Sequence, residues 1–127
     1  MRMRLASVAL ALIMSACSTT GGIISDRLYF GQNIGMDRTV SPDDWRDFVA
    51  TVVTPHFPNG LTILQGDGQW RDPHGNLVRE HVYIIEVEHA PSAEIDAAIA
   101  AIAAEYKTRF QQDAVLRITE HATMRFY

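Results

Sequence analysis

Residues 61–89 read LTILQGDGQWRDPHGNLVREHVYIIEVEH, and this stretch decides the fold. Its middle, Asp72-Pro73-His74-Gly75-Asn76, has strong turn chemistry, because proline fixes φ and glycine accepts a positive φ. The second flank centres on Val82-Tyr83-Ile84-Ile85, whose β-branched and aromatic residues favour a strand. We therefore predict one strand over 61–71, a second strand over 77–89, and a hairpin that joins them.

A helix is predicted on each side of this hairpin. Upstream, Ser41 can cap a helix with proline at its first position, and apolar residues then repeat with the helical period: Trp45, Phe48, Val49, Val52 and Val53. Downstream, Ser92 can cap a helix that keeps this period as far as Phe110. Strands are predicted over 26–34 and 115–119, with another extended piece over 123–127.

The predicted order is therefore strand, helix, strand, strand, helix, strand. This is the order of the ferredoxin-like βαββαβ fold, an α+β class in which two helices cover one face of a four-stranded antiparallel sheet. The strands over 26–34 and 77–89 are then central, and the other two lie at the edges. A small barrel with peripheral helices is the competing interpretation, and the regular period of both helices favours the sheet.

The predicted central strands are apolar on both sides. In the run Val82-Tyr83-Ile84-Ile85, neighbouring apolar residues point to opposite faces of the sheet. A sheet with one face in water should alternate between apolar and polar residues, so the second face is expected to be covered. We predict a homodimer, with a ligand or the chain's own Met124, Phe126 and Tyr127 as the alternative covers.

The N-terminus has the features of an export signal. A charged start, MRMR, precedes an apolar run from Leu5 to Met14 that is too short to cross a membrane. With Ser15-Ala16-Cys17 after it, the segment resembles a bacterial lipoprotein signal, although Met14 stands where leucine is usual. The resemblance implies cleavage before Cys17 and a lipid anchor on its thiol. Cys17 is also the only cysteine, so no disulfide forms within the chain.

These features divide the chain into a signal peptide over 1–16, a lipid-anchored tether over 17–25 and one α+β domain over 26–127. The expected location is the bacterial cell envelope, on the periplasmic face of the outer membrane. The formal net charge is −4, and it falls to −6 once Arg2 and Arg4 leave with the signal. Nucleic-acid binding needs a basic face, so we expect no nucleic-acid partner.

Little in the sequence points to catalysis. The five histidines include no pair at the spacing of helical or turn metal ligands, and no serine lies in a G-x-S-x-G motif. We therefore predict no metal, no cofactor and no catalytic residue.

The hairpin carries the candidate binding site. If it is symmetric about its turn, Gly68 pairs with Glu80, and Gly66, Gly68 and Trp70 share a face with Glu80. Two glycines on one face leave a bare strip of backbone beside a carboxylate, which a ligand can approach closely. The alternative is that a nearby side chain fills the strip. The predicted ligand-binding residues are Gly66, Gly68, Trp70 and Glu80, with Tyr29 on the neighbouring strand as a secondary candidate.

Four stretches resemble the bacterial domain of unknown function family 3574: DRLYFGQNIG, DDWRDFVATVVTPHFPNGLTILQGDGQWRD, NLVRE and YKTRFQQDAVLR. The resemblance covers nearly all of residues 26–127. It implies small exported proteins, often lipid-anchored, with no assigned activity. His81 stands where the family pattern has serine, so no role is carried over to that position.

Two functions are open at this point. The first is a non-catalytic, lipid-anchored module that binds a small ligand or a partner. The second is a cofactor-independent enzyme of the dimeric ferredoxin-like kind, with a desolvated Glu80 as acid or base. The first is favoured because no acid–base pair stands out.

Overall fold

The predicted hairpin is present and organises the sheet. The computed structural model describes residues 22–127. In it, β4 (Thr62–Arg71) and β5 (Leu77–His89) pair antiparallel across the turn. The register is the one expected from a symmetric hairpin, with Gly68 opposite Glu80. The faces assigned to the hairpin residues from sequence are therefore correct.

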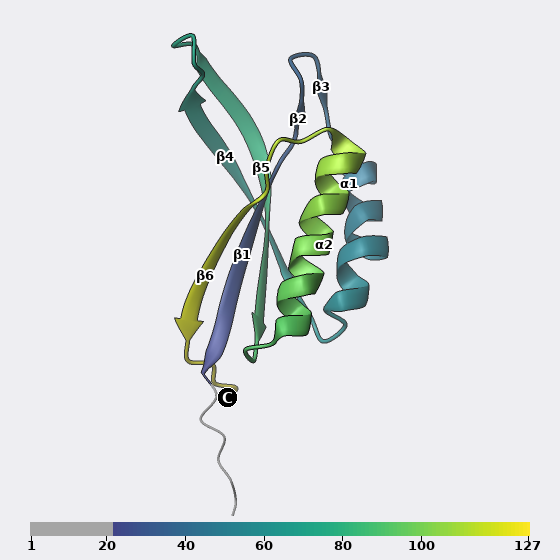
Figure 1. The fold of residues 1–127 in the computed structure, drawn as a ribbon, viewed down its shortest axis with the longest axis vertical. Coiled ribbons are helices and arrows are strands. Elements are labelled where there is room, and N and C mark those ends of the chain that lie inside the picture. Colours follow the sequence, from purple (N-terminus) through teal and green to yellow (C-terminus); the bar gives the residue numbers. More distant parts are fainter. Residues whose placement is uncertain (1–21) are drawn as a thin grey trace, which may run out of the picture.

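The sheet is completed by two strands from the ends of the domain. β1 (Ile23–Gly31) pairs antiparallel with β5 on one side and with β6 (Leu116–Ala122) on the other. The strand order is β4-β5-β1-β6, so β1 and β5 are central, as predicted. The sheet is open at its two edges (Figure 1), which excludes a small barrel. The ferredoxin-like α+β fold is confirmed.

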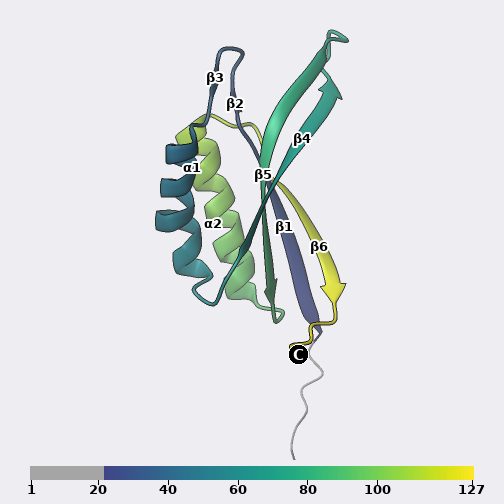
Figure 2. The ribbon, with the colours of Figure 1, turned by 180° about the vertical axis from the view of Figure 1, so that it is seen from behind.

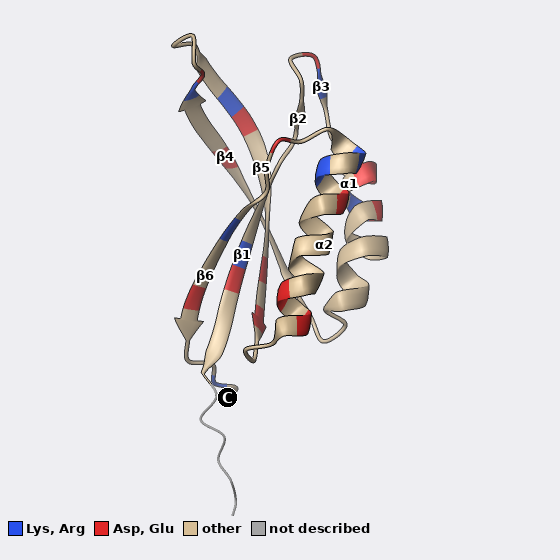
Figure 3. Ribbon diagram, viewed as in Figure 1, with Lys and Arg blue, Asp and Glu red and all other residues tan. Residues whose placement is uncertain are grey.

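Both helices lie on the same side of the sheet (Figures 1 and 2). α1 (Pro42–Phe48) begins after Ser41, whose hydroxyl accepts a hydrogen bond from the Asp44 N–H at 3.1 Å. α2 (Ala93–Phe110) begins after Ser92, which caps it in the same way. Acidic residues lie at the start of α2 and basic residues at its end (Figure 3), an arrangement that stabilises the helix dipole.

The first helix changes its winding near its middle. α1 continues into a π turn, Val49–Val53, and then into a short 3₁₀ turn, Thr54–His56. The helical period predicted one regular helix through Val53, and it gave no sign of the wider turn. Val49 and Val53 are both buried, so the predicted apolar face still packs on the sheet.

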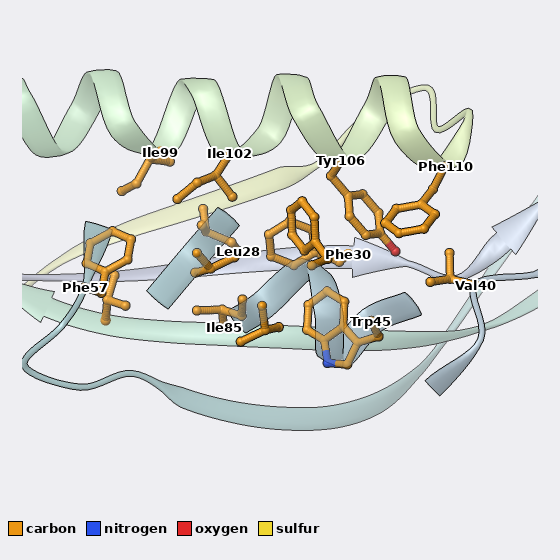
Figure 4. Packing of buried hydrophobic residues seen from close by; sticks show 14 residues of the cluster. Leu28, Phe30, Val40, Trp45, Phe57, Ile85, Ile99, Ile102, Tyr106 and Phe110 are labelled. Atoms are coloured by element: carbon orange, nitrogen blue, oxygen red, sulfur yellow. The ribbon is translucent and has the colours of Figure 1, made fainter. Parts of the chain in front are cut away.

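Aromatic side chains fill the centre of the core (Figure 4). The ring of Phe30 lies 5.3 Å from that of Trp45 and 4.8 Å from that of Tyr106, centroid to centroid. Trp45 also stacks on Tyr83, with ring centroids 4.3 Å apart and planes 4° from parallel. Every buried apolar side chain of the described chain lies within residues 24–110. The described core is thus formed by residues from β1 to the end of α2.

Three segments differ from the sequence prediction. β1 begins at Ile23, so the last three residues of the predicted tether are part of the sheet. The strand predicted over 26–34 ends at Gly31, and its last two residues instead form β2 (Asn33–Ile34), which pairs with β3 (Arg38–Thr39) in a small hairpin. The extended piece predicted over 123–127 forms no strand. The last two segments are too short for hydrophobic periodicity to identify them correctly.

The predicted signal peptide and Cys17 lie outside the described residues. Within residues 22–127, no helix combines the length and the apolar character needed to cross a membrane.

The sheet has one face under the helices and one face without them. On β1, Leu28 and Phe30 are buried beneath the helices, and Tyr29 between them points to the other side. Residues opposite one another on neighbouring strands share a side of the sheet. Tyr29 is opposite both Ile84 and Leu116, and Ile84 is also opposite Leu64. We call the side that carries these four residues the open face.

Candidate functional site

The turn of the hairpin is held by Asp72. Its carboxylate accepts hydrogen bonds from the backbone N–H of His74 at 2.9 Å and from that of Asn76 at 2.8 Å. The hydrogen bonds from the side chain and backbone of Asn76 lower the pKa of Asp72 below its ordinary value. Gly75 has a φ of +84°, a conformation that favours glycine. These contacts stabilise the turn, so the residues of the turn have a structural role.

A groove of about 650 Å³ lies on the open face, where the hairpin leaves the rest of the sheet. One wall comes from the segment after α2, because Gln111 adopts a left-handed conformation (φ 54°) that ends the helix and redirects the chain. We call this the Glu80 groove. Its lining comprises Tyr29, Gly31, Asn33, Gly35, Gly68, Trp70, Val78, Glu80, Val82, Gln111, Gln112, Asp113, Ala114 and Leu116.

Glu80 is held in place by the end of β1 and the residues after it. Its Oε1 accepts a hydrogen bond from the Asn33 backbone N–H at 2.8 Å. The carboxylate lies over Gly31, where an added Cβ would come within 2.6 Å of Oε1. Asn33 is fixed in turn by the Gln112 side chain, which donates to the Asn33 carbonyl oxygen at 2.7 Å. Glycine at position 31 therefore makes room for the half-buried carboxylate of Glu80.

A core residue supports the same site from beneath. The hydroxyl of Tyr106 donates a hydrogen bond to the Gly31 carbonyl oxygen at 2.7 Å. Burial raises the pKa of Tyr106, and the negative charge of Glu80 raises it further. Tyr106 thus stays protonated and remains a donor at neutral pH. The packing of α2 is linked in this way to the backbone under Glu80.

Four of the five predicted site residues line one groove: Tyr29, Gly68, Trp70 and Glu80. Gly66 does not line it, because the side chains of Val82 and Ile84 lie 3.5 and 3.8 Å from the position of an added Cβ. A Cβ added at Gly68 would have the Glu80 backbone carbonyl oxygen as its nearest neighbour, at 3.7 Å. No side chain therefore fills the glycine strip at Gly68.

Two residues that hold Glu80 were missed by the sequence reasoning. The sequence analysis gave Gly31 no role beyond its place in the predicted strand over 26–34, although a glycine within a strand can also signal a close approach. Asn33 acts through its backbone N–H, for which a sequence carries no signal.

The charge of the groove is one-sided. Its lining holds two carboxylates, Glu80 and Asp113, and among the residues that the structure describes it contains no lysine or arginine. Trp70, with 45% of its surface exposed, and Tyr29 add aromatic surface. The groove can therefore present a carboxylate and two aromatic rings to a ligand.

A second hollow of about 520 Å³ adjoins the first and shares Asn33, Gly68 and Glu80 with it. It also contains Asp67 and His81, whose Oδ1 and Nδ1 lie 2.5 Å apart. Both of these side chains are largely exposed, so water screens their interaction. No cluster of three or more metal-ligating side chains occurs within residues 22–127.

The other titratable cluster lies on the helix-covered face. Asp26 is fully buried and accepts hydrogen bonds from Arg117 at 2.6 and 2.8 Å, from the Thr119 hydroxyl at 2.5 Å and from His89 Nε2 at 2.9 Å. Burial alone would raise the pKa of Asp26, but the hydrogen bonds from Arg117, Thr119 and His89 outweigh it and lower the pKa to about 2. Its partners satisfy this carboxylate, so its role is structural.

Known structures share this fold. A phage SAM lyase in complex with S-methyl-5'-thioadenosine superposes with a TM-score of 0.62 at 22% identity, covering 80% of this chain and 82% of that chain. A phage SAM lyase in its apo state gives a TM-score of 0.61 at 18% identity, covering 95% and 99%. At these identities the likeness shows the fold alone. No curated protein sequence matches the chain.

The sequence itself matches a family model. Residues 25–126 match the model described as a protein of unknown function, DUF3574. The match covers nearly the whole described domain, in agreement with the resemblance carried by the four stretches quoted above. The chain belongs to the DUF3574 family.

Proposed function

We propose that this protein is a non-catalytic binding module, tethered to the cell envelope through Cys17, whose Glu80 groove takes a small organic cation. The observation that carries the proposal is the position of the Glu80 carboxylate, held by the Asn33 N–H over Gly31 in a groove lined by acids and aromatic rings.

The chemistry of the groove favours a cation. The Asn33 backbone N–H donates to Oε1 of Glu80. Within the described chain, this leaves Oε2 of Glu80 to accept a hydrogen bond from a ligand. A charge-assisted hydrogen bond to a carboxylate is about twice as strong as a neutral one. Trp70 and Tyr29 can add cation–π attraction of about 0.5–2 kcal/mol. An anion would meet the unopposed charges of Glu80 and Asp113 and would be repelled.

The second candidate is an enzyme that uses Glu80 as acid or base. One observation favours it: two solved structures with this fold are SAM lyases, one of them bound to S-methyl-5'-thioadenosine. SAM carries a sulfonium cation, which suits an acidic groove. The fold hosts many functions, so this likeness counts only together with the groove's own chemistry.

The ligand proposal predicts a difference between two matched compounds. SAM and S-methyl-5'-thioadenosine share an adenosine group, but only SAM is cationic. We expect SAM to bind at least about 10-fold more tightly by isothermal titration calorimetry, since its α-ammonium group can donate a charged hydrogen bond to Glu80, which contributes about 1.5–3 kcal/mol. Glu80→Gln should abolish this preference. Glu88→Gln should keep it, because Glu88 lies on the same strand and face but outside the groove.

Three results would count against this proposal: equal affinity for the two compounds, a preference for SAM that survives Glu80→Gln, or no binding of SAM and of a simple cation such as choline. Chromatography of the SAM incubation separates the two candidate functions. Formation of S-methyl-5'-thioadenosine that is lost in Glu80→Gln supports the enzyme, and unchanged SAM supports the binding module.

The tether is tested separately. In bacteria fed a fatty-acid probe, the wild-type chain should be labelled and the Cys17→Ser variant should not, because only a thiol at that position receives the lipid. The anchored protein should fractionate with the outer membrane, and Cys17→Ser should be released from it. Equal labelling of both chains would rule out the anchor and leave the ligand proposal untouched.

A further inference from the structure

The open face carries an apolar patch drawn from all four strands, interrupted on β5 by Glu80. Leu64, Trp70, Leu116 and Ile118 are 44%, 45%, 55% and 38% exposed. Pairing places four less exposed apolar side chains among them: Tyr29, Val78, Val82 and Ile84. Together they expose apolar surface on the order of 500 Å², at the upper end of what monomeric proteins show.

No part of the described chain covers this patch. Both helices lie on the opposite face (Figures 1 and 2). The C-terminal side chains that could have folded over it remain exposed, with Phe126 at 89% and Tyr127 at 111%. Within residues 22–127, the C-terminal segment that the sequence suggested as a cover therefore does not lie over the patch.

The hairpin adds a second reason to expect a neighbour. Pairing between β1 and β5 ends at Gly31 opposite Val82. Beyond this point the hairpin continues as two strands, from Asp67 opposite His81 to Arg71 opposite Leu77, and projects past the sheet (Figure 1). We call residues 67–81 the arm. A two-stranded hairpin alone is only marginally stable in water, yet this arm exposes the apolar side chains of Trp70 and Leu77.

The size and layout of the patch fit a second copy of this chain. One side of a standard interface buries about 800 Å², of which about 57% is apolar, so the patch supplies the apolar area that such an interface needs. Charged groups lie both within the patch and beside it. Glu80 stands between Val78 and Val82 on β5, and Arg27, paired with Glu86 and Glu120, lies opposite Ile118 near the other end. Interfaces combine apolar area with hydrogen-bonded polar groups in this way.

We propose that two copies of this chain pair through their open faces, with sheet against sheet. Face-to-face sheets pack about 10 Å apart with interdigitating side chains, and a two-fold axis buries the same patch on both protomers. The Glu80 groove opens on this face, so the partner forms its outer wall and rests against the arm. The pairing does not depend on which ligand the groove binds.

Neighbouring residues of β4 provide a matched test. Leu64 and Ile63 are 44% and 43% exposed on opposite sides of the same strand. In sedimentation equilibrium of residues 22–127, which contain the whole described core, the wild type should have twice the monomer mass at 100 μM. Leu64→Lys should weaken self-association at least 10-fold, whereas Ile63→Lys should leave it unchanged. Circular dichroism establishes that both variants fold.

A second variant and a second measurement distinguish weakened self-association from local unfolding caused by a single substitution. Leu116→Lys, on the opposite edge strand, should weaken association as Leu64→Lys does. Amide hydrogens of the arm should be protected from exchange in the wild type and lose at least 10-fold in protection in both open-face variants. A wild type that stays monomeric at 100 μM, or equal weakening by Ile63→Lys and Leu64→Lys, overturns the proposal.

Discussion

Replacement of Phe30 by alanine should lower the free energy of unfolding by about 4 kcal/mol, because the change removes a buried ring and leaves a cavity. Phe30 is fully buried, and its ring contacts those of Trp45, Phe48 and Tyr106 at centroid distances of 5.3, 5.9 and 4.8 Å. These neighbours come from both helices, so the cavity cannot close without moving both. A domain of this size has only about 5–15 kcal/mol of stability.

Urea denaturation measures this loss as a lower midpoint with an unchanged slope. The matched control is Tyr29→Ala, the adjacent residue of β1 on the open face, which should cost about 1 kcal/mol. Both changes are best made in the Leu64→Lys background, so that self-association does not contribute. Equal losses at positions 29 and 30 would show that the two faces of the sheet are equally packed.

Asp26→Asn should be the second most damaging change described here, with a loss of about 3 kcal/mol. Removal of one partner from a buried ion pair leaves the other charge uncompensated, which costs about 3–5 kcal/mol. The lower end applies because Arg117 also donates to Asp96 at 2.7 Å and is partly exposed. The control is Asp43→Asn, at an exposed ion pair with Arg46, which should change stability by less than about 1 kcal/mol.

The same carboxylate predicts a dependence on pH. The pKa of Asp26 is about 2 in the fold against an ordinary value of 3.8, so the folded state binds this proton less tightly than the unfolded state. The contribution of Asp26 is complete above pH 3.8 and is lost as the pH falls toward 2. We expect the wild type to lose about 2 kcal/mol from this group between pH 5 and pH 2, because each pKa unit corresponds to about 1.4 kcal/mol.

Asp26→Asn should lack this part of the acid sensitivity, since asparagine does not titrate. Urea midpoints of both proteins at several pH values give the comparison. If the two curves stay parallel between pH 5 and pH 2, the low pKa of Asp26 does not contribute to stability.

The fold could be predicted because local signals agreed with one another. The turn around Gly75 set the hairpin register, and the caps Ser41 and Ser92 set where the helices begin. These are short-range effects of residue type, which a sequence displays directly. The π turn at Val49–Val53 was missed because its apolar residues also fit an ordinary helix.

The candidate site was predicted only where it depends on the hairpin. Gly68, Trp70 and Glu80 were placed on one face by register alone, and the structure puts all three in the groove. The contacts that hold Glu80 come from Gly31 and the Asn33 backbone, 47 or more positions away along the chain. Contacts of this kind depend on the packing of β1 against β5, and no local pattern encodes them.

The placement of the two tryptophans gives the molecule two optical reporters. Trp45 is 3% exposed and stacked on Tyr83 inside the core, whereas Trp70 is 45% exposed at the groove. A buried indole emits at shorter wavelength, and a solvated one emits at longer wavelength and is accessible to soluble quenchers. In the Leu64→Lys variant, in which the open faces are not paired, acrylamide should therefore quench Trp70 first and leave Trp45 as the residual signal. Intrinsic fluorescence can thus follow occupancy of the groove and melting of the core as separate signals, without any added label.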